Sequence, residues 1–134
     1  NANIYYGRSM GAHLSKKYRN DYKSFGLFTN QGEYSCYVSY TNFKVTDCPL
    51  YIAPRGSLDE ALHKIILHKK TPALFLDLGK ARSLDWLNRP IPVRFANHVN
   101  IEYGYWVKYS IPYQFDGIFY IDKTTSAKSY ARKP

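Results

Sequence analysis

The chain has 134 residues, a formal net charge of +9 and an aromatic content of 17%, with 14 tyrosines. This length suits one domain with a hydrophobic core, and no apolar run is long enough to cross a bilayer. The lysines and arginines are scattered, and no basic-aromatic RNA-binding motif accompanies them. The charge is therefore that of a solvated basic surface and does not predict a specific nucleic-acid site.

The first part of the chain is predicted to form a helix followed by extended segments. Apolar residues at intervals of four predict a helix over residues 9–18, with Ser9 as its N-cap. Gly32 lies between two runs of alternating side chains and predicts a hairpin turn at 30–32 with positive φ. Pro49 restricts the last extended segment to an edge strand or an interrupted one. The expected extended segments are 22–30, 32–40 and 43–53.

The clearest element of the sequence is a helix within residues 54–70. Ser57 and Glu60 have the spacing of a capping box, and an apolar stripe follows them. The continuous apolar run at 72–78 is typical of a strand that is buried on both faces. A short helical turn is expected at 83–90, with its first serine as the cap and its final proline as the stop.

The last part of the chain gives a mixed signal and then a strong one. Alternating apolar side chains over 101–111 favour a strand, whereas Gly104 and Pro112 favour a loop. Residues 115–121 form an apolar run and are predicted to be the final buried strand. Buried strands linked by helices predict an α/β fold, in which a mixed sheet contains an antiparallel hairpin and helices pack on the sheet.

Two aspartates, Asp77 and Asp122, lie at the ends of the apolar strands. Ligands collect at the carboxyl ends of strands in open α/β sheets, so we predict Asp77 as a substrate-binding residue. The same reasoning makes the two aspartates a carboxylate pair at one edge of the sheet. Aspartates at strand ends also commonly close the turn that follows, and this simpler interpretation applies to both residues.

His98 is the best candidate among the histidines, because it lies in a polar segment close to Arg94. We predict both as substrate-binding residues, although a loop histidine is commonly only solvated. His63 and His68 are not spaced to share one helix face, so they do not predict a metal site. No nucleophile with a nearby base is evident, so the catalytic residues stay unassigned, and no cofactor or metal is expected.

The two cysteines, Cys36 and Cys48, are too far apart in sequence for a CxxC redox or zinc motif. They form one disulfide if their strands are neighbours, and otherwise they are two buried thiols. Since both alternatives are open, the cysteines do not decide whether the compartment is cytoplasmic or extracytoplasmic.

Further information lies in the order of several short motifs along the chain. They are "SMGAHLSKKY" (9–18), "YKSFGLFTNQGEYS" (22–35), "APRGSLDEALHK" (53–64), "ALFLDLGKAR" (73–82), "DWLNRP" (85–90) and "FDGIFYIDKTTSAKS" (115–129). In this order and spacing, the chain resembles the C-terminal part of the erythromycin esterase family. No single motif is diagnostic, but together they span nearly the whole chain.

The resemblance implies a metal-independent hydrolase of esters or lactones, for which opening of a macrolide ring is the type reaction. It also implies that residues 1–134 are a domain or subdomain from the C-terminal part of a larger α/β hydrolase-type domain. The family's catalytic histidines and glutamates lie mostly in its N-terminal half, and Asn3 stands where one histidine would, unless that segment is missing. Gly79 replaces a family arginine and Gln31 a family glutamate. If those residues support the site, it is altered here.

We therefore expect the C-terminal portion of an erythromycin-esterase-like hydrolase from a bacterium. It would act on a small ester or a macrolide-like substrate through the full-length protein, with its main proton-transfer groups outside these residues. The alternative is a non-catalytic binding module, whose basic, tyrosine-rich surface takes a glycan or a polyanion. A third, structural role is self-association through unpaired sheet edges.

Overall fold

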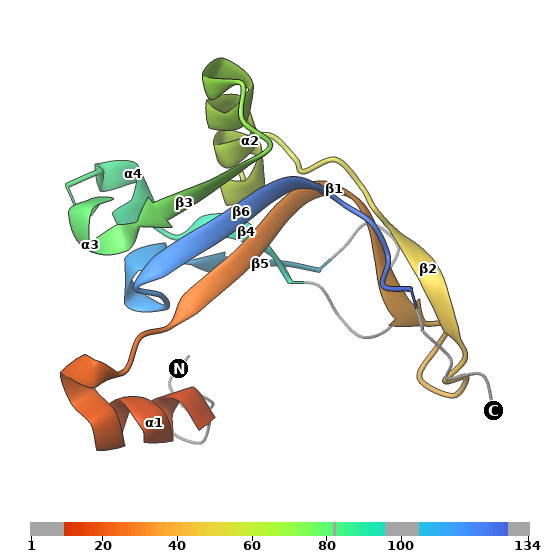
Figure 1. Ribbon diagram of the computed structural model, residues 1–134, viewed down its shortest axis with the longest axis horizontal. Helices are drawn as coiled ribbons and strands as arrows, with labels where there is room; N and C mark the ends of the chain where they lie inside the picture. The colour runs from red at the N-terminus through yellow and green to blue at the C-terminus, as the bar shows by residue number, and fades with distance from the viewer. Residues whose placement is uncertain (1–9, 82, 96–104, 129–134) are drawn as a thin grey trace.

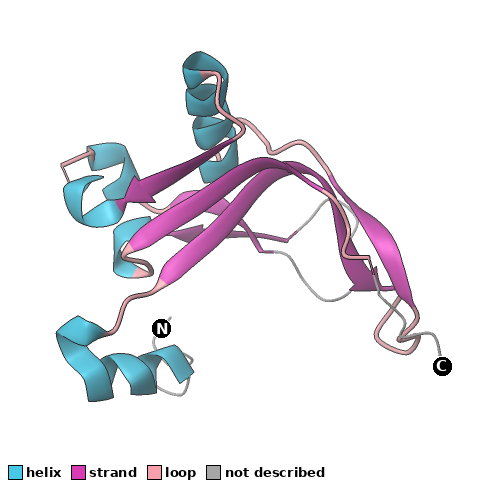
Figure 2. Ribbon diagram, viewed as in Figure 1, coloured by secondary structure: helices cyan, strands magenta, loops and turns pink. Residues whose placement is uncertain are grey.

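The computed structural model describes residues 10–81, 83–95 and 105–128, which form a sheet, a separate ribbon and short helices (Figure 1). The strands are β1 (Phe25–Tyr37), β2 (Val45–Leu50), β3 (Ala73–Asp77), β4 (Ile91–Phe95), β5 (Tyr105–Tyr109) and β6 (Gly117–Thr124). The helices are α1 (Met10–Tyr18), α2 (Leu58–Lys69), α3 (Leu78–Ala81) and α4 (Asp85–Asn88). Figure 2 shows how these helices, strands and loops alternate along the chain.

The larger sheet has the strand order β2-β1-β6-β3. Its two central strands, β1 and β6, are parallel, and each outer strand runs antiparallel to its neighbour. Figure 1 shows β6 lying alongside β1, although the two strands come from opposite ends of the chain. This topology confirms the prediction of an α/β fold with a mixed sheet and an antiparallel hairpin.

The hairpin is not where the sequence placed it. The turn predicted at 30–32 is wrong, because β1 continues through these residues and pairs with β2, with Gly32 opposite Leu50. Gly32 does have a positive φ of 118°, and a Cβ there would collide with the backbone of Thr124 on β6. A glycine that permits close approach of two backbones within a sheet gives the same local signal as a glycine in a turn.

The edge strand β2 is tied to β1 by a disulfide. Pro49 lies in this edge strand, as predicted. Cys36 on β1 and Cys48 on β2 are both buried and bonded, with their Cα atoms 5.9 Å apart. This separation is typical of a disulfide between neighbouring strands. Of the two alternatives that the sequence left open, a disulfide or two buried thiols, the structure has the disulfide.

The α2 helix begins as its sequence predicts. The Ser57 hydroxyl accepts a hydrogen bond from the backbone N–H of Glu60 at 3.2 Å. The Glu60 carboxylate reaches back to the N–H of Gly56, at 3.4 Å, rather than to that of Ser57. The helix ends at Lys70, which adopts a left-handed conformation with φ of 51°. Local capping chemistry therefore fixes both ends of α2.

The other predicted caps have different outcomes. The N-cap of α4 is Leu84, which makes no side-chain cap bond, so the prediction of Ser83 is wrong. Ser83 instead lies in a tight turn after α3, closed by a hydrogen bond from the Leu84 N–H to the Ala81 carbonyl. The α4 turn ends before Pro90, as predicted. Ser9 lies outside the described residues.

The two-stranded ribbon pairs β4 with β5 in antiparallel fashion, with Val93 opposite Val107. The strand expected from alternation is confirmed over Tyr105–Tyr109, whereas residues 101–104 lie outside the described part of the chain. A 3-10 turn at Ile111–Tyr113 follows, in agreement with the loop signal of Pro112. The strand signal is thus correct for 105–109 and the loop signal of Pro112 for its own segment, whereas Gly104 lies outside the described residues.

One apolar core lies between the sheet, α2, the α3–α4 segment and the ribbon. Alternate residues of the central strands point into it, so that one face of the sheet is covered. The β6 residues Ile118 and Tyr120 are completely buried there. The buried members of this core are Phe28, Leu58, Leu62, Ile66, Leu78, Ala81, Leu87, Val93, Ile111, Ile118 and Tyr120.

The opposite face of the sheet is apolar but exposed. We call it the uncovered face and define it by Phe25 and Leu27 on β1, Phe75 on β3, and Phe119 and Ile121 on β6; their exposed fractions run from 40% to 71%. The prediction that residues 72–78 are buried on both faces is therefore wrong for this structure. β3 is an edge strand, and none of the described helices lies over its outer face.

Candidate functional site

A cluster of polar side chains lies on the covered side of the sheet, where α2 packs against the middle of β1 and β6. The α2 helix brings Asp59 and His63 there because they stand one helical turn apart, on the stripe that faces the sheet. We call this group the polar cluster. Its members are Asn30, Asp59, His63, Arg94, Tyr120 and Asp122.

Asp59 has no exposed surface, like Tyr120 in the same cluster. Its Oδ2 accepts a hydrogen bond from the backbone N–H of Arg94 at 3.3 Å, and its Oδ1 has no partner among the described residues. Burial raises the pKa of Asp59 from 3.8 to about 6, against the opposing effect of the Arg94 charge. A carboxyl group with this pKa can exchange a proton near neutral pH.

Arg94, predicted as a substrate-binding residue, is held on three sides. Its Nη2 atom donates hydrogen bonds to two backbone carbonyls, that of Asn30 at 3.0 Å and that of Tyr51. Its guanidinium lies 5.0 Å from the centroid of the Trp106 ring. Burial lowers the pKa of Arg94, while the charge of Asp59 raises it. The Nε atom is buried and has no partner within the described residues.

Tyr120, Asp122 and His63 form the second half of the polar cluster. The Tyr120 hydroxyl lies 3.1 Å from both the Asp59 carbonyl and Oδ1 of Asp122. Burial, followed by the nearby Asp122 charge, raises the pKa of Tyr120, so that its hydroxyl stays protonated and donates. Nδ1 of His63 is 2.6 Å from the same Asp122 oxygen. With the proton on Nδ1, His63 donates to Asp122 and leaves Nε2 as an acceptor.

The His63–Asp122 pair has the chemistry of a base with its orienting carboxylate. The side chain of His63 is 27% exposed, so that its ring is accessible from one side. No serine, threonine or cysteine belongs to the polar cluster, and none of the cavities described below includes His63. The pair therefore links α2 to β6 without forming a complete nucleophilic site.

The predicted carboxylate pair of Asp77 and Asp122 is wrong. β3 and β6 are antiparallel, so Asp77 lies opposite Gly117 at the start of β6, while Asp122 lies at the far end of that strand. Asp77 Oδ1 accepts a hydrogen bond from the Lys80 N–H at 3.3 Å, which closes the turn into α3. The turn-closing interpretation is thus correct for Asp77.

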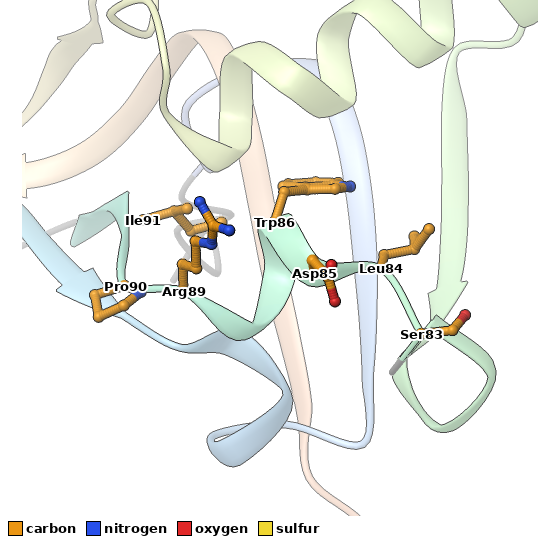
Figure 3. Close-up of a pocket in the computed structure, with 7 residues that line it drawn as sticks. All are labelled: Ser83, Leu84, Asp85, Trp86, Arg89, Pro90 and Ile91. Carbon is orange, nitrogen blue, oxygen red and sulfur yellow. The ribbon is translucent and has the colours of Figure 1, made fainter.

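Among the residues that the structure describes, the predicted residue Asp77 lines a cavity of about 340 Å³, together with Phe25 and Phe75. A larger cavity, of about 590 Å³, surrounds α4 and is open to solvent (Figure 3). Figure 3 shows the Trp86 ring and the Arg89 guanidinium on the same side of this turn. An aromatic face beside a cation suits a planar, sugar-like or anionic ligand.

Of the predicted substrate-binding residues, Asp77 and Arg94 lie on different sides of the sheet and do not meet. His98 lies outside the described residues. Sequence reasoning missed Asp59 and the His63–Asp122 pair, whose members are 59 residues apart. The available signal was a local one: Asp59 and His63 stand on the helical stripe that Leu62 and Ile66 bury.

Two general features are absent from the described part of the chain. No group of three or more histidine, cysteine, aspartate or glutamate side chains there is arranged to hold a metal ion. No described helix combines the length and apolar character that a membrane span requires.

Comparisons with known proteins give information on the fold and on the family of the chain. Two solved structures match it over 84% of its length: a succinoglycan biosynthesis protein, at 23% identity and a TM-score of 0.68, and a protein from Bacillus cereus, at 22% identity and 0.70. Such likeness establishes a shared fold. The chain spans only 26% and 27% of those two proteins.

The family comparison is more specific than the structural one. No curated protein sequence matches the chain. The sequence profile for erythromycin esterase matches residues 3–124, which is most of the chain and includes all of the motifs that carried the resemblance except the end of the last one. The chain therefore belongs to the erythromycin esterase family.

Proposed function

We propose that the protein hydrolyses carboxylic esters or lactones and that residues 1–134 form the C-terminal portion of its hydrolase domain. The observation that carries this proposal is the family match over residues 3–124. The small share of each similar solved structure that the chain spans supports the idea of a larger domain. The reaction is addition of water to the carbonyl carbon, followed by loss of the alcohol, without a metal.

In this proposal the described residues form the scaffold and one wall of the substrate cleft. Arg94 has its guanidinium fixed by two carbonyls, so that it can present positive charge without reorganising. Asp77 lies on the opposite side of the sheet from Arg94 and closes the turn into α3, so we do not include it in this wall. His98, near Arg94 in sequence, is proposed as the second substrate-binding residue of the wall. The main catalytic groups belong to polypeptide outside residues 1–134.

The test compares the full-length protein with residues 1–134, using p-nitrophenyl esters and macrocyclic lactones. We expect hydrolysis by the full-length protein that persists in a chelator, and none by the shorter chain. Equal hydrolysis by residues 1–134 would show that the catalytic groups lie within them, with His63 and Asp122 as the first residues to replace. Failure of the full-length protein on every ester and lactone would reject the hydrolase proposal.

A second candidate function is the binding of a glycan or a polyanion, favoured by the cavity at α4. Trp86 is 38% exposed there, beside Arg89. Trp86→Ala should abolish retention on heparin or on an acidic polysaccharide in moderate salt. Phe43→Ala, which removes an aromatic ring 67% exposed elsewhere, should leave retention unchanged. If both variants elute like the unmodified protein, retention reflects only net charge.

A further inference from the structure

The uncovered face has the makeup of a protein interface. Leu27, Phe119 and Phe75 lie in register across the three adjacent strands β1, β6 and β3. The rings of Phe25, Phe75 and Phe119 contact one another, with centroids between 4.9 and 6.1 Å apart. Each of these three rings is nevertheless about half exposed. Mutually packed aromatic side chains are the typical anchors of interfaces.

The strand composition also favours a cover. All-parallel sheets are covered on both faces, and the parallel pair β1–β6 at the centre of this mixed sheet shares their apolar character. A solvent-facing strand would alternate polar and apolar residues, but Ile118–Ile121 is apolar on both sides. Exposed apolar surface of this kind is rare in monomers unless another element packs on it. The uncovered face is therefore built to be buried.

We propose that the uncovered face is the docking surface for a helix of the same protein, supplied by polypeptide outside residues 1–134. The inference rests on the proposed function insofar as both assume a larger domain. Three-quarters of each similar solved structure lies outside the part that this chain matches, which is ample polypeptide for a second helical layer. The occupant is intramolecular, so it does not depend on protein concentration.

The dimensions of the face identify the kind of occupant. The row Leu27–Phe119–Phe75 spans three strands, or roughly 10 Å, which is the diameter of one helix. An amphipathic helix with apolar residues on one stripe fits this row. The cavity of about 340 Å³ beside Phe25 and Phe75 lies at the end of the face and is also lined by Lys23, Asp77 and Asp116. It has room for one long side chain of that helix with an apolar stem and a polar tip.

Hydroxyl-radical footprinting of the native full-length protein tests the inference without any variant. Phe75 and Phe119 should be oxidised severalfold more slowly than Phe43, which is 67% exposed and lies away from the face. Equal oxidation of all three would overturn the proposal. Protection that disappears on dilution would also overturn it, because the occupant would then be a second copy. Footprinting does not depend on catalysis, so an inactive protein with a protected face would reject only the proposed hydrolase function.

A matched pair of leucine variants gives an independent test in the full-length protein. Leu27→Glu on the face should lower the melting temperature and raise the oxidation of Phe119 severalfold. Leu67→Glu should do neither, although Leu67 has a similar exposed fraction of 62% on the outer side of α2. Equal effects of the two substitutions on melting temperature and on Phe119 oxidation would mean that the face is not a docking surface. If Leu27→Glu fails to fold while Leu67→Glu folds, burial of Leu27 is supported, and the footprint of the native protein decides the occupant.

Discussion

The two faces of the central sheet are made from the same strands but differ in their surroundings. On β6, Ile118 and Tyr120 are fully buried against α2 and the ribbon, whereas Phe119 and Ile121 are 49% and 40% exposed. The side chains are equally apolar on the two sides, so neighbouring elements rather than the strands make the difference. Strand composition thus reports which faces are suited to burial, and only the packing of other elements decides which are buried.

The faces also differ in where they place polar groups. The covered face holds Asn30 near the middle of β1, and Tyr120 and Asp122 near the middle of β6, where α2, β4 and the Ala53 N–H supply partners. Most of the polar atoms in this region are hydrogen-bonded, as buried groups must be. The uncovered face carries mainly aliphatic and aromatic side chains. The covered face thus combines an apolar core with a polar network, which makes it the better candidate for chemistry.

The largest expected difference between the faces comes from two isoleucines on one strand. In residues 1–134, Ile118→Ala should lower the free energy of unfolding by about 2–5 kcal/mol, because it leaves a cavity in a packed core. Ile121→Ala should change it by about 0.5 kcal/mol or less, as for a surface site. Urea unfolding measures both. Similar losses of unfolding free energy in the two variants would mean that the two faces do not differ in burial. We expect similar losses only in the full-length protein, where the proposed helix covers Ile121.

The covered face should also make the stability of the protein depend on pH, because it contains the buried carboxyl group of Asp59. The pKa of Asp59 is about 6 in the folded chain, against 3.8 for a free aspartate, so the folded state binds the proton more tightly. Stability should therefore fall as pH rises from about 4 to about 6, by about 3 kcal/mol at most for this group. Asp59→Asn keeps an acceptor for the Arg94 N–H and should flatten this dependence.

The measurement is urea unfolding of both proteins at intervals from acid to neutral pH. Exposed Asp47 provides the control, because Asp47→Asn should leave the slope as it is in the unmodified chain. A slope that persists unchanged in Asp59→Asn would mean that the carboxyl group is not the one that titrates with folding.

Local chemistry made part of the fold predictable from the sequence. The cap and stripe of α2 were identified because each signal depends on residues within a few positions of one another. The pairing of β1 with β6 was not predicted, because two parallel strands about 90 residues apart in sequence show no pattern within either segment that identifies the partner. Gly32 misled for the same reason, since its backbone neighbour is Thr124 on the distant strand.

The site was harder to predict than the fold. Asp77 and Asp122 look equivalent in sequence, but the antiparallel pairing of β3 with β6 puts them at opposite ends. Arg94 was predicted from its segment as a substrate-binding residue, and this stays a prediction. Its partners in the structure, the carbonyls of Asn30 and Tyr51, were not predicted. The unusual pKa of Asp59 comes from burial, which a helix-start aspartate does not reveal, because aspartate there is ordinarily a solvated partner of the helix dipole.

The hydroxyl of Tyr120 tests how far the polar network stabilises the covered face. Tyr120→Phe should lower the free energy of unfolding by about 1–3 kcal/mol, because buried acceptors on Asp59 and Asp122 lose their donor. Tyr113→Phe is the matched control, since Tyr113 is 80% exposed and should tolerate the change. Chemical denaturation compares the two. Equal, small losses would mean that a water replaces the hydroxyl without cost.

The smallest expected effect concerns the cap that holds α2 over the covered face. Ser57→Ala removes both the acceptor for the Glu60 N–H and a donor to the Pro54 carbonyl, so the free energy of unfolding should fall by about 1–2 kcal/mol. Ser57→Thr keeps both bonds and should recover most of the loss. Ser83→Ala is the control, because the α4 turn has no side-chain cap. If Ser83→Ala were as costly as Ser57→Ala, the loss would not be specific to the cap. The core contacts of Leu58 and Leu62 would then hold α2 over the sheet.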